Sequence, residues 1–183
     1  MRIAIVGEES KGYSPGRYSK GFKVIVSKTR RPKTRFSHIK SMDYGCFRKA
    51  FIEAKEKGCD EAILLNNRNE LVEGSRTNIF FVKKGILYTP ATHCGCLNGI
   101  TRRIVLRLAR QMDIPCKSVI ADVSVLRQAD EAFVTNAVMG VMPLTVVEGQ
   151  AIGRKGAGPV TKKLLNAYYT NVHSSCPAQG KSV

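Results

Sequence analysis

The chain has 183 residues, 43% of them hydrophobic, and this length and composition favour one globular domain with its own core over a disordered protein. No apolar run approaches the roughly 20 residues of a membrane span, and the start lacks the apolar segment of a signal peptide, so we expect a cytoplasmic protein without a membrane partner. The formal net charge is +16, from 30 basic and 14 acidic residues. The six cysteines form no CxxC pair and no paired His/Cys spacing, so we expect reduced thiols and no metal site.

The first third of the chain is expected to contain two strands and one helix. Strands are predicted over residues 2–6 and 22–27, joined by the turn-rich segment KGYSPGRYSKG. An extended connector, TRRPKTRFSHI, then leads to Lys40. Apolar residues at helical spacing predict a helix from about residue 42 to 57, with Gly58 after it as a stop signal.

The middle of the chain is rich in short apolar runs. A buried strand is predicted in CDEAILLNN, and a hairpin is predicted from the runs at 79–82 and 86–88, on either side of a Lys-Lys-Gly turn. Helical spacing returns in LNGITRRIVLRLARQM. The apolar side of that helix is expected to carry Ile104, Leu106, Leu108 and Ala109.

The last third is predicted to continue with a strand in CKSVIADV, a short helix in SVLRQAD and a strand in EAFVTNAV. A hairpin that turns at Glu148-Gly149 and a closing helix in GPVTKKLLNAYYTNV follow. The composition of the tail, residues 173–183, predicts disorder. Because strands and helices do not simply alternate, we expect an α+β fold with a curled, barrel-like sheet.

The positive charge is concentrated near the start of the chain. From Ser10 to Met42 there is no acidic residue, and ten basic residues supply 10 of the 16 net charges. Tyr13, Tyr18, Phe22 and Phe36 interleave with these bases, as in a surface that stacks on nucleic acid. An anionic small molecule or cofactor, or a solvated basic surface, would explain the same charge.

Three places carry polar groups where a core would not need them. Glu73 precedes Gly74 at the edge of the predicted sheet, and a buried acid is costly unless a cation or a proton donor meets it. The segment NGITRR opens a helix, whose free N–H groups attract anions, although an ordinary helix start would read the same way. Thr135-Asn136 interrupts an apolar strand, either as the floor of a pocket or as a satisfied core pair.

Taken together, these segments resemble the class IV aminotransferases, the fold-type IV pyridoxal-phosphate enzymes. The matching pieces, all between residues 38 and 165, are HIKSMDY, GCDEAILL, LVEGSRTNIFFVKKGILYTP, LNGITRRIVLRLA, ADEAFVTNAVMGVMPL and GPVTKKLL. The resemblance implies the larger, barrel-like C-terminal domain of the D-amino-acid aminotransferase-like fold, with pyridoxal 5′-phosphate as cofactor. Within the family, TNAVMGVMPL is most similar to the aminodeoxychorismate lyases.

The resemblance implies two residues for the chemistry. By position, Lys40 matches the lysine that forms a Schiff base with the cofactor and, once freed, moves protons at the substrate. Glu73 matches the acid that pairs with the pyridine nitrogen of the cofactor and keeps it protonated. Desolvation and the neighbouring cations are expected to favour a partly deprotonated Lys40.

The other cofactor-binding positions implied by the resemblance are Leu97, Gly99, Ile100, Thr101, Asn136 and Ala137. Leu97 would pack behind the cofactor ring, and the three residues from Gly99 would form the phosphate turn. The last two residues occupy a second phosphate-contacting strand. Many transaminases carry a threonine in the place of Ala137, so its hydroxyl contact is either lost here or replaced by Asn136 or by backbone.

The resemblance favours an aminodeoxychorismate lyase, which would release 4-aminobenzoate and pyruvate on the route to folate. One alternative is a transaminase of the branched-chain or D-amino-acid type. Another is a catalytically impaired or non-enzymatic relative that binds nucleic acid through its basic segment. Either enzyme would act on a small anionic amino compound.

Family members carry a small N-terminal domain ahead of the segment that RIAIVGEESKGYSP resembles. We therefore expect residues 1–37 to be the end of an N-terminal region with a connector, 38–172 to bind the cofactor, and 173–183 to be a tail. An arginine that clamps the cofactor phosphate in the family has no match here, and Arg30, Arg31 or Arg35 could replace it. Since homodimers are usual in the family, a partner subunit is expected to complete the pocket.

Overall fold

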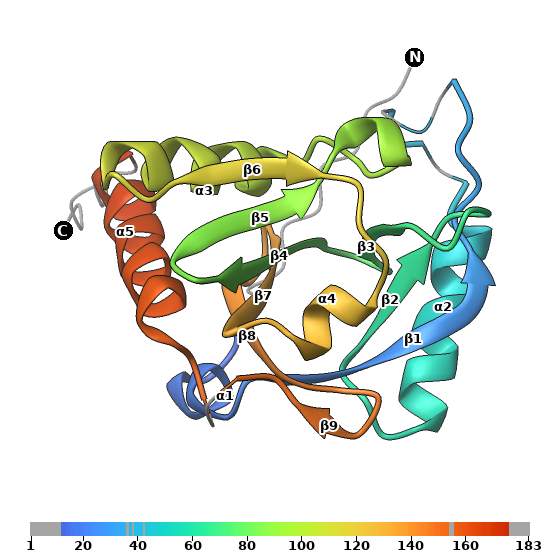
Figure 1. The fold of residues 1–183 in the computed structure, drawn as a ribbon. Helices are drawn as coiled ribbons and strands as arrows, with labels where there is room; N and C mark the ends of the chain where they lie inside the picture. The colour runs from blue at the N-terminus through green and yellow to red at the C-terminus, as the bar shows by residue number, and fades with distance from the viewer. Residues whose placement is uncertain (1–11, 36, 38, 42, 154–155, 176–183) are drawn as a thin grey trace, which may run out of the picture.

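The computed structural model describes residues 12–35, 37, 39–41, 43–153 and 156–175 (Figure 1). The strands are β1 (Phe22–Arg30), β2 (Glu61–Leu65), β3 (Leu71–Gly74), β4 (Asn78–Lys83), β5 (Ile86–Pro90), β6 (Cys116–Val119), β7 (Glu131–Asn136), β8 (Gly140–Val147) and β9 (Gln150–Ala151). The helices are α1 (Pro15–Lys20), α2 (Gly45–Glu56), the 3-10 turn η1 (Thr92–Cys94), α3 (Ile100–Gln111), α4 (Ser124–Arg127) and α5 (Pro159–Ser175).

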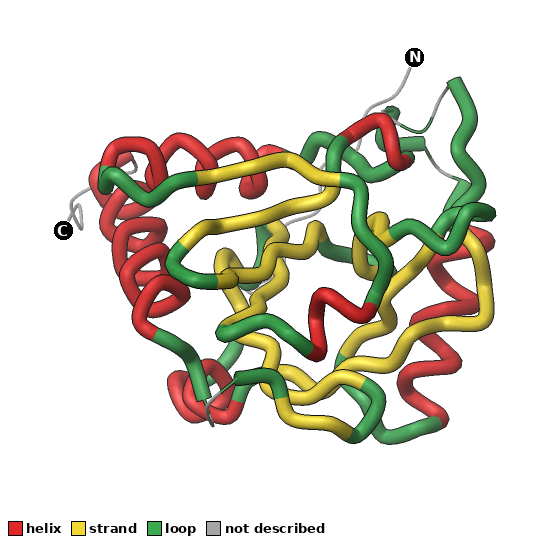
Figure 2. Tube along the Cα trace, in the orientation of Figure 1, coloured by secondary structure: helices red, strands yellow, loops and turns green. Residues whose placement is uncertain are grey.

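The strands form one mixed sheet in the order β3-β2-β1-β8-β7-β4-β5-β6, with β9 paired to β8. β1 runs parallel to β2 and β8, and β5 runs parallel to β6. The two ends of the sheet approach each other, because Glu70 bridges to Asp122 and the Leu71 N–H donates to the Ala121 carbonyl at 2.7 Å. The sheet therefore curls, as Figure 1 and Figure 2 show, and the predicted α+β fold with a barrel-like sheet is confirmed.

The core has three parts, one inside the curled sheet and two outside it. The inner part includes Leu126 of α4 and side chains from most of the strands. Outside the sheet, α3 and α5 cover a cluster that includes the stacked rings of Phe80 and Phe133, and α2 packs Ala50 and Ala54 against β1 and β2. The helices α2, α3 and α5 each bury only one face, which is the arrangement that amphipathic spacing predicts.

The two predicted tight turns have the backbone conformations that such turns require. Lys84 and Gly85 have φ of 50° and 75°, and Glu148 and Gly149 have φ of 49° and 75°. Two consecutive positive φ values are typical of the two-residue hairpin turn whose twist matches that of its strands. The hairpins formed by β4 with β5 and by β8 with β9 therefore turn at the predicted residues.

The structure differs from the sequence predictions in several elements. The segment predicted as a turn contains α1, which has a proline in its first turn and ends at Gly21 with φ of 68°. Val105 is fully buried on α3 although it was not predicted to be, whereas Leu106 is only partly buried. The predicted strand at 2–6 lies outside the described residues, as do residues 176–183 of the predicted tail. Residues 173–175, which were predicted to belong to a disordered tail, instead form the end of α5. The predicted domain boundary at residue 38 stays a prediction, although β1, which precedes it, belongs to the same sheet.

The described cysteines, Cys46, Cys59, Cys94, Cys96 and Cys116, are free thiols. Burial raises the pKa of the Cys96 thiol to about 12, so this group is protonated and unreactive at neutral pH.

Within the described residues, no helix combines the length and the apolar character that crossing a membrane requires.

Candidate active site

A cavity of about 890 Å³ lies where five segments converge. Its lining comes from the connector after β1, the start of α2, the turn between β3 and β4, the segment that opens α3, and the end of β7. The cavity brings together all eight residues that the resemblance singled out, namely Lys40, Glu73, Leu97, Gly99, Ile100, Thr101, Asn136 and Ala137. Their roles stay predictions, but their shared location does not depend on the resemblance.

Glu73 lies at the end of β3 and is 4% exposed. Both of its carboxylate oxygens have partners: the Arg31 Nε–H donates to Oε1 at 3.4 Å, and the Leu97 N–H donates to Oε2 at 3.0 Å. Burial raises the pKa of Glu73 to about 7, although the Leu97 N–H and the charges of Arg31 and Lys40 act in the opposite direction. Glu73 is therefore a buried acid that a cation in the cavity would ionise fully.

Arg31 is the residue that meets Glu73, and the sequence did not predict this pairing. Its side chain is 14% exposed, its guanidinium stacks 4.8 Å from the centre of the Phe47 ring, and it donates to the Ser37 carbonyl at 3.3 Å. Arg31 was one of three candidates for clamping the cofactor phosphate. The structure instead places its charge against the carboxylate of Glu73.

Lys40 lies in the connector that leads to α2 and lines the same cavity as Glu73. It is close enough for its charge to act on the carboxylate of Glu73. The side chain of Lys40 is exposed. The described residues therefore do not bury and desolvate Lys40, contrary to the expectation from the sequence. Lys40 is therefore placed at the open side of the cavity and Glu73 at its buried side.

The start of α3 provides a turn without side-chain bulk. Gly99 is the N-cap residue, with φ of −60° and ψ of 152°, and it has no side chain with which to cap the helix. A Cβ at this position would lie 2.3 Å from the Oδ1 of Asn78. The amide nitrogen of the same Asn78 side chain donates to the Leu97 carbonyl at 2.7 Å. The first N–H groups of the helix and its dipole therefore favour an anion at this end of the cavity.

We expect Gly99→Ala to destabilise the protein by about 1–3 kcal/mol, because the added methyl group must displace Asn78 or the turn itself. Denaturant unfolding measures the difference. Gly16→Ala is the matched control, since a Cβ there meets nothing within 4 Å. Equal stability of the two variants would show that the turn adapts to a side chain at no cost.

The arginines after this turn are not equivalent. Arg102 is 4% exposed and donates to the Pro90 carbonyl at 3.1 Å and to the Asn98 Oδ1 at 3.0 Å, whereas Arg103 is exposed. Burial lowers the pKa of Arg102. Arg102 stands in the first turn of the helix but is not solvated, and it ties the turn to the end of β5.

The end of β7 supplies the last part of the lining. The Asn136 Oδ1 accepts from the N–H groups of Val138 and Met139 at 3.0 and 2.9 Å, and its amide nitrogen donates to the Arg76 carbonyl at 3.3 Å. This side chain therefore holds the turn between β7 and β8. Thr135 also lines the cavity and is 1% exposed, and its hydroxyl has no hydrogen-bond partner among the described residues.

A buried acid that the sequence analysis did not single out supports the turn between β3 and β4. Glu61 of β2 is 0% exposed, and it accepts from the Ser75 N–H at 3.1 Å, from the Ser75 hydroxyl and from the Thr77 hydroxyl at 3.2 Å. These bonds fix the segment that follows Glu73 in the cavity lining. The sequence signal for Glu61 is an acidic residue next to the apolar run AILL, followed downstream by a Ser-Arg-Thr turn that can donate hydrogen bonds to it.

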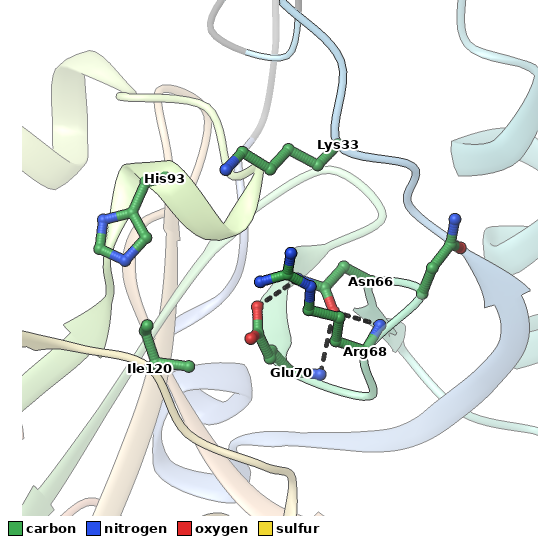
Figure 3. Close-up of a pocket in the computed structure, with 7 residues that line it drawn as sticks. Lys33, Asn66, Arg68, Glu70, His93 and Ile120 are labelled. Atoms are coloured by element: carbon green, nitrogen blue, oxygen red, sulfur yellow. Dashed lines mark hydrogen bonds between the residues drawn. The ribbon is translucent and has the colours of Figure 1, made fainter.

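A second cavity, of about 260 Å³, lies next to the turn that follows β2. Figure 3 shows Asn66, Arg68 and Glu70 gathered on one side of it, with His93 and Ile120 on the other. Asn66 donates to the Glu70 carboxylate at 2.6 Å and accepts from the Arg68 N–H at 2.9 Å. Asn66 and Glu70 therefore have hydrogen-bond partners within the turn itself, which indicates a structural role for the turn.

Three of the four aromatic residues of the basic segment pack in or against the core. Tyr13 packs edge-on against Phe22, whose side chain is 1% exposed, and the Tyr18 hydroxyl donates to the Met139 carbonyl at 2.9 Å. Arg17 pairs with Asp60. Phe36 lies outside the described residues. These contacts favour a structural role for the three described rings over a surface that stacks on bases.

Comparison with known proteins gives a consistent result. The family model for Amino-transferase class IV matches residues 8–147. A branched-chain-amino-acid aminotransferase from Pseudomonas aeruginosa is 34% identical over 97% of this chain and 56% of its own length. The crystal structure of the Escherichia coli branched-chain amino acid aminotransferase matches with a TM-score of 0.82 and 28% identity, over 86% of this chain and 53% of that one.

A further solved structure carries a cofactor adduct in its name. The T.th. branched-chain amino acid aminotransferase, complexed with N-(5′-phosphopyridoxyl)-L-glutamate, matches with a TM-score of 0.79 and 32% identity. The match covers 87% of this chain and 54% of that one. The chain thus spans about half the length of the relatives and structures that it matches.

Proposed function

This chain belongs to the class IV aminotransferases, and we propose that its cavity binds pyridoxal 5′-phosphate and serves amino transfer between an amino acid and a 2-oxo acid. One observation carries the proposal. Lys40, Glu73 and the turn that opens α3 are far apart in the sequence, yet they line one cavity of about 890 Å³. An amine, a buried carboxylate and an anion-binding turn are the three groups that this cofactor requires.

The residues present fit the cofactor. Glu73 is buried with a pKa of about 7, so a protonated ring nitrogen beside it would favour its ionised form and pair with the carboxylate, as Arg31 does. The turn at Gly99 has no room for a Cβ and exposes helix N–H groups, which suits a phosphate. Leu97, which lies between Glu73 and Gly99 in the sequence, contributes an apolar side chain to the lining of the same cavity.

We propose a role for each of these residues. When bound, pyridoxal phosphate supplies an aldehyde for the amino group and a protonated ring that draws electrons from the substrate Cα. Lys40 holds the cofactor through its amine and, when free, removes and returns the proton at Cα. Glu73 keeps the proton on the ring nitrogen, while Arg31 and the Leu97 N–H keep its carboxylate in place.

For the substrate, we propose branched-chain amino acids. The resemblance of TNAVMGVMPL to aminodeoxychorismate lyases covers ten residues, whereas the relative from Pseudomonas aeruginosa, named a branched-chain-amino-acid aminotransferase, matches 97% of the chain. The comparisons therefore support the transaminase alternative over the lyase, and a role in folate synthesis has no support from them. Ile39, Phe47 and Leu97 give the cavity apolar surface that would suit an aliphatic side chain.

We further propose that a second copy of the chain completes the site. Lys40 is exposed, and two apolar residues of the cavity lining are unusually open, Ile39 at 50% and Ile100 at 67% exposed. Tyr44, also in the lining, is 42% exposed. Apolar side chains around the mouth of a polar site are the pattern that an interface would cover. Sedimentation of the protein with and without cofactor measures the assembly.

The test of substrate and reaction uses cofactor-reconstituted protein in two parallel assays. We expect amino transfer from leucine, valine or isoleucine to 2-oxoglutarate, and no 4-aminobenzoate from aminodeoxychorismate. Formation of 4-aminobenzoate without amino transfer would instead support the lyase interpretation. Absence of both activities, with no cofactor bound to Lys40 after borohydride reduction and mass spectrometry, would contradict the proposed function.

A further inference from the structure

The hydroxyl of Thr135 is a polar group that the fold buries without giving it a partner. Thr135 is 1% exposed, and among the described residues nothing accepts from or donates to its Oγ1. A buried hydroxyl without a hydrogen bond is costly, and such a group in a native protein calls for an explanation, such as a bound ion or water. Thr135 lines the same cavity as Lys40 and Glu73.

The direction of the Thr135 side chain follows from strand geometry. Phe133, two residues earlier on β7, belongs to the cluster that α3 covers, and side chains two residues apart in a strand share a face. Thr135 therefore points toward the side of the sheet on which α3 lies. Residues directly opposite in an antiparallel pair also share a face, and the residue opposite Thr135 on β4 is Asn78.

Asn78 connects this position to the start of α3. Its amide nitrogen donates to the Leu97 carbonyl at 2.7 Å, and its Oδ1 lies where a Cβ on Gly99 would be placed. The unpartnered hydroxyl of Thr135 is thus beside the residue that contacts the turn at the N-terminus of α3. The helix start and the free hydroxyl are independent observations that point to the same place.

The other candidate for this contact is already engaged. In the resemblance, a hydroxyl is expected two residues further on, where this chain has Ala137. Asn136 could have replaced it, but its Oδ1 holds the turn between β7 and β8, and its amide nitrogen donates to the Arg76 carbonyl in the turn between β3 and β4. Among residues 135–137, only Thr135 has a buried side-chain polar atom without any partner in the structure as described.

We propose that the Thr135 hydroxyl donates a hydrogen bond to the phosphate group of the bound cofactor and takes over the contact that Ala137 cannot make. The proposal rests on the proposed function for the identity of the ligand, a phosphate monoester. It concerns this chain's own way of holding that group, because the hydroxyl comes from β7 itself and not from the residue that follows it.

The test compares Thr135→Val, which removes the hydroxyl at nearly constant shape, with Thr135→Ser, which keeps it. The probe is pyridoxine 5′-phosphate, which has no aldehyde and cannot react with Lys40, with inorganic phosphate as competitor and calorimetry as readout. We expect Thr135→Val to weaken binding of the ester about tenfold, as the loss of one hydrogen bond to a charged group predicts, and Thr135→Ser to bind nearly as wild type.

Thr161→Val is the matched control. Thr161 is 0% exposed and its hydroxyl also lacks a partner in the described structure, but it lies in α5 and outside the cavity lining. We expect this variant to bind the ester like wild type. Because each valine removes a buried, unpaired hydroxyl, both variants should unfold at the same temperature as the wild type or higher, so a fold defect would be recognised.

The outcomes separate the two proposals. Equal affinity of Thr135→Val and wild type, or no binding of the ester by the wild type, would overturn the role of Thr135. Binding of the ester that depends on Thr135, without any covalent attachment of pyridoxal phosphate to Lys40, would sustain the phosphate site and contradict the proposed function. Weaker binding in Thr161→Val as well would assign the effect to the fold and overturn the specific contact.

Discussion

Replacing Lys40 with alanine is expected to lower amino transfer by about 10³-fold or more. The lysine is the one amine among the described residues that line the cavity. Under the proposed function, its removal takes away both the covalent hold on the cofactor and the base that moves the substrate proton. Proton transfer by a positioned side chain alone contributes about 10²–10⁴-fold. The measurement is the initial rate of transfer from leucine to 2-oxoglutarate, with saturating cofactor so that occupancy is not limiting.

Lys28→Ala is the control for the loss of one positive charge in the same basic segment. Lys28 is exposed on β1 and does not line the cavity, so its replacement should leave the rate unchanged. Borohydride reduction followed by peptide mass spectrometry should find the cofactor on Lys40 in the wild type and in Lys28→Ala. A cofactor attached to another lysine, or full activity in Lys40→Ala, would contradict the assignment.

Local sequence patterns predicted those parts of the fold that local interactions decide. The hairpin turns at Lys84-Gly85 and Glu148-Gly149 follow from residues that tolerate positive φ, and the amphipathic spacing of α2 and α3 follows from the faces they bury. The helix α1 was missed because a six-residue helix carries too little periodicity, and its proline and glycine were interpreted as turn signals.

The candidate site depends on contacts that local patterns do not contain. Arg31 and Glu73 are 42 residues apart in the sequence, and nothing near either residue indicates the other. Lys40 stands in a connector without periodicity, as one of ten basic residues, and only the resemblance singled it out. The preference for a lyase rested on a short segment near the site, whereas the similarity of the whole chain supports the transaminase alternative better.

Glu73→Gln is expected to change the dependence of stability on pH. Burial raises the pKa of Glu73 from about 4.5 to about 7 in the folded cofactor-free protein, so folding favours the protonated acid. The contribution of Glu73 to stability is therefore fully present below pH 4.5 and is lost as the pH rises through 7. Glutamine does not titrate, so from pH 4 to pH 8 the stability of the variant relative to the wild type should rise by about 3 kcal/mol.

Cofactor binding should offset the stability that the wild type loses when Glu73 ionises above pH 7. A protonated ring nitrogen favours the ionised form of Glu73, so the affinity of the wild type for pyridoxine 5′-phosphate should rise as the pH passes through 7, whereas that of Glu73→Gln should not.

Amino transfer by the Glu73→Gln variant should fall by about 10²-fold, the usual loss when one electrostatic partner of a reacting group is removed. Glu56→Gln, at an exposed acid of α2, controls for charge and should match the wild type in all three measurements. If the relative stability of Glu73→Gln is flat with pH, then the carboxylate is already ionised in the cofactor-free protein, and Arg31 alone is sufficient to hold it so.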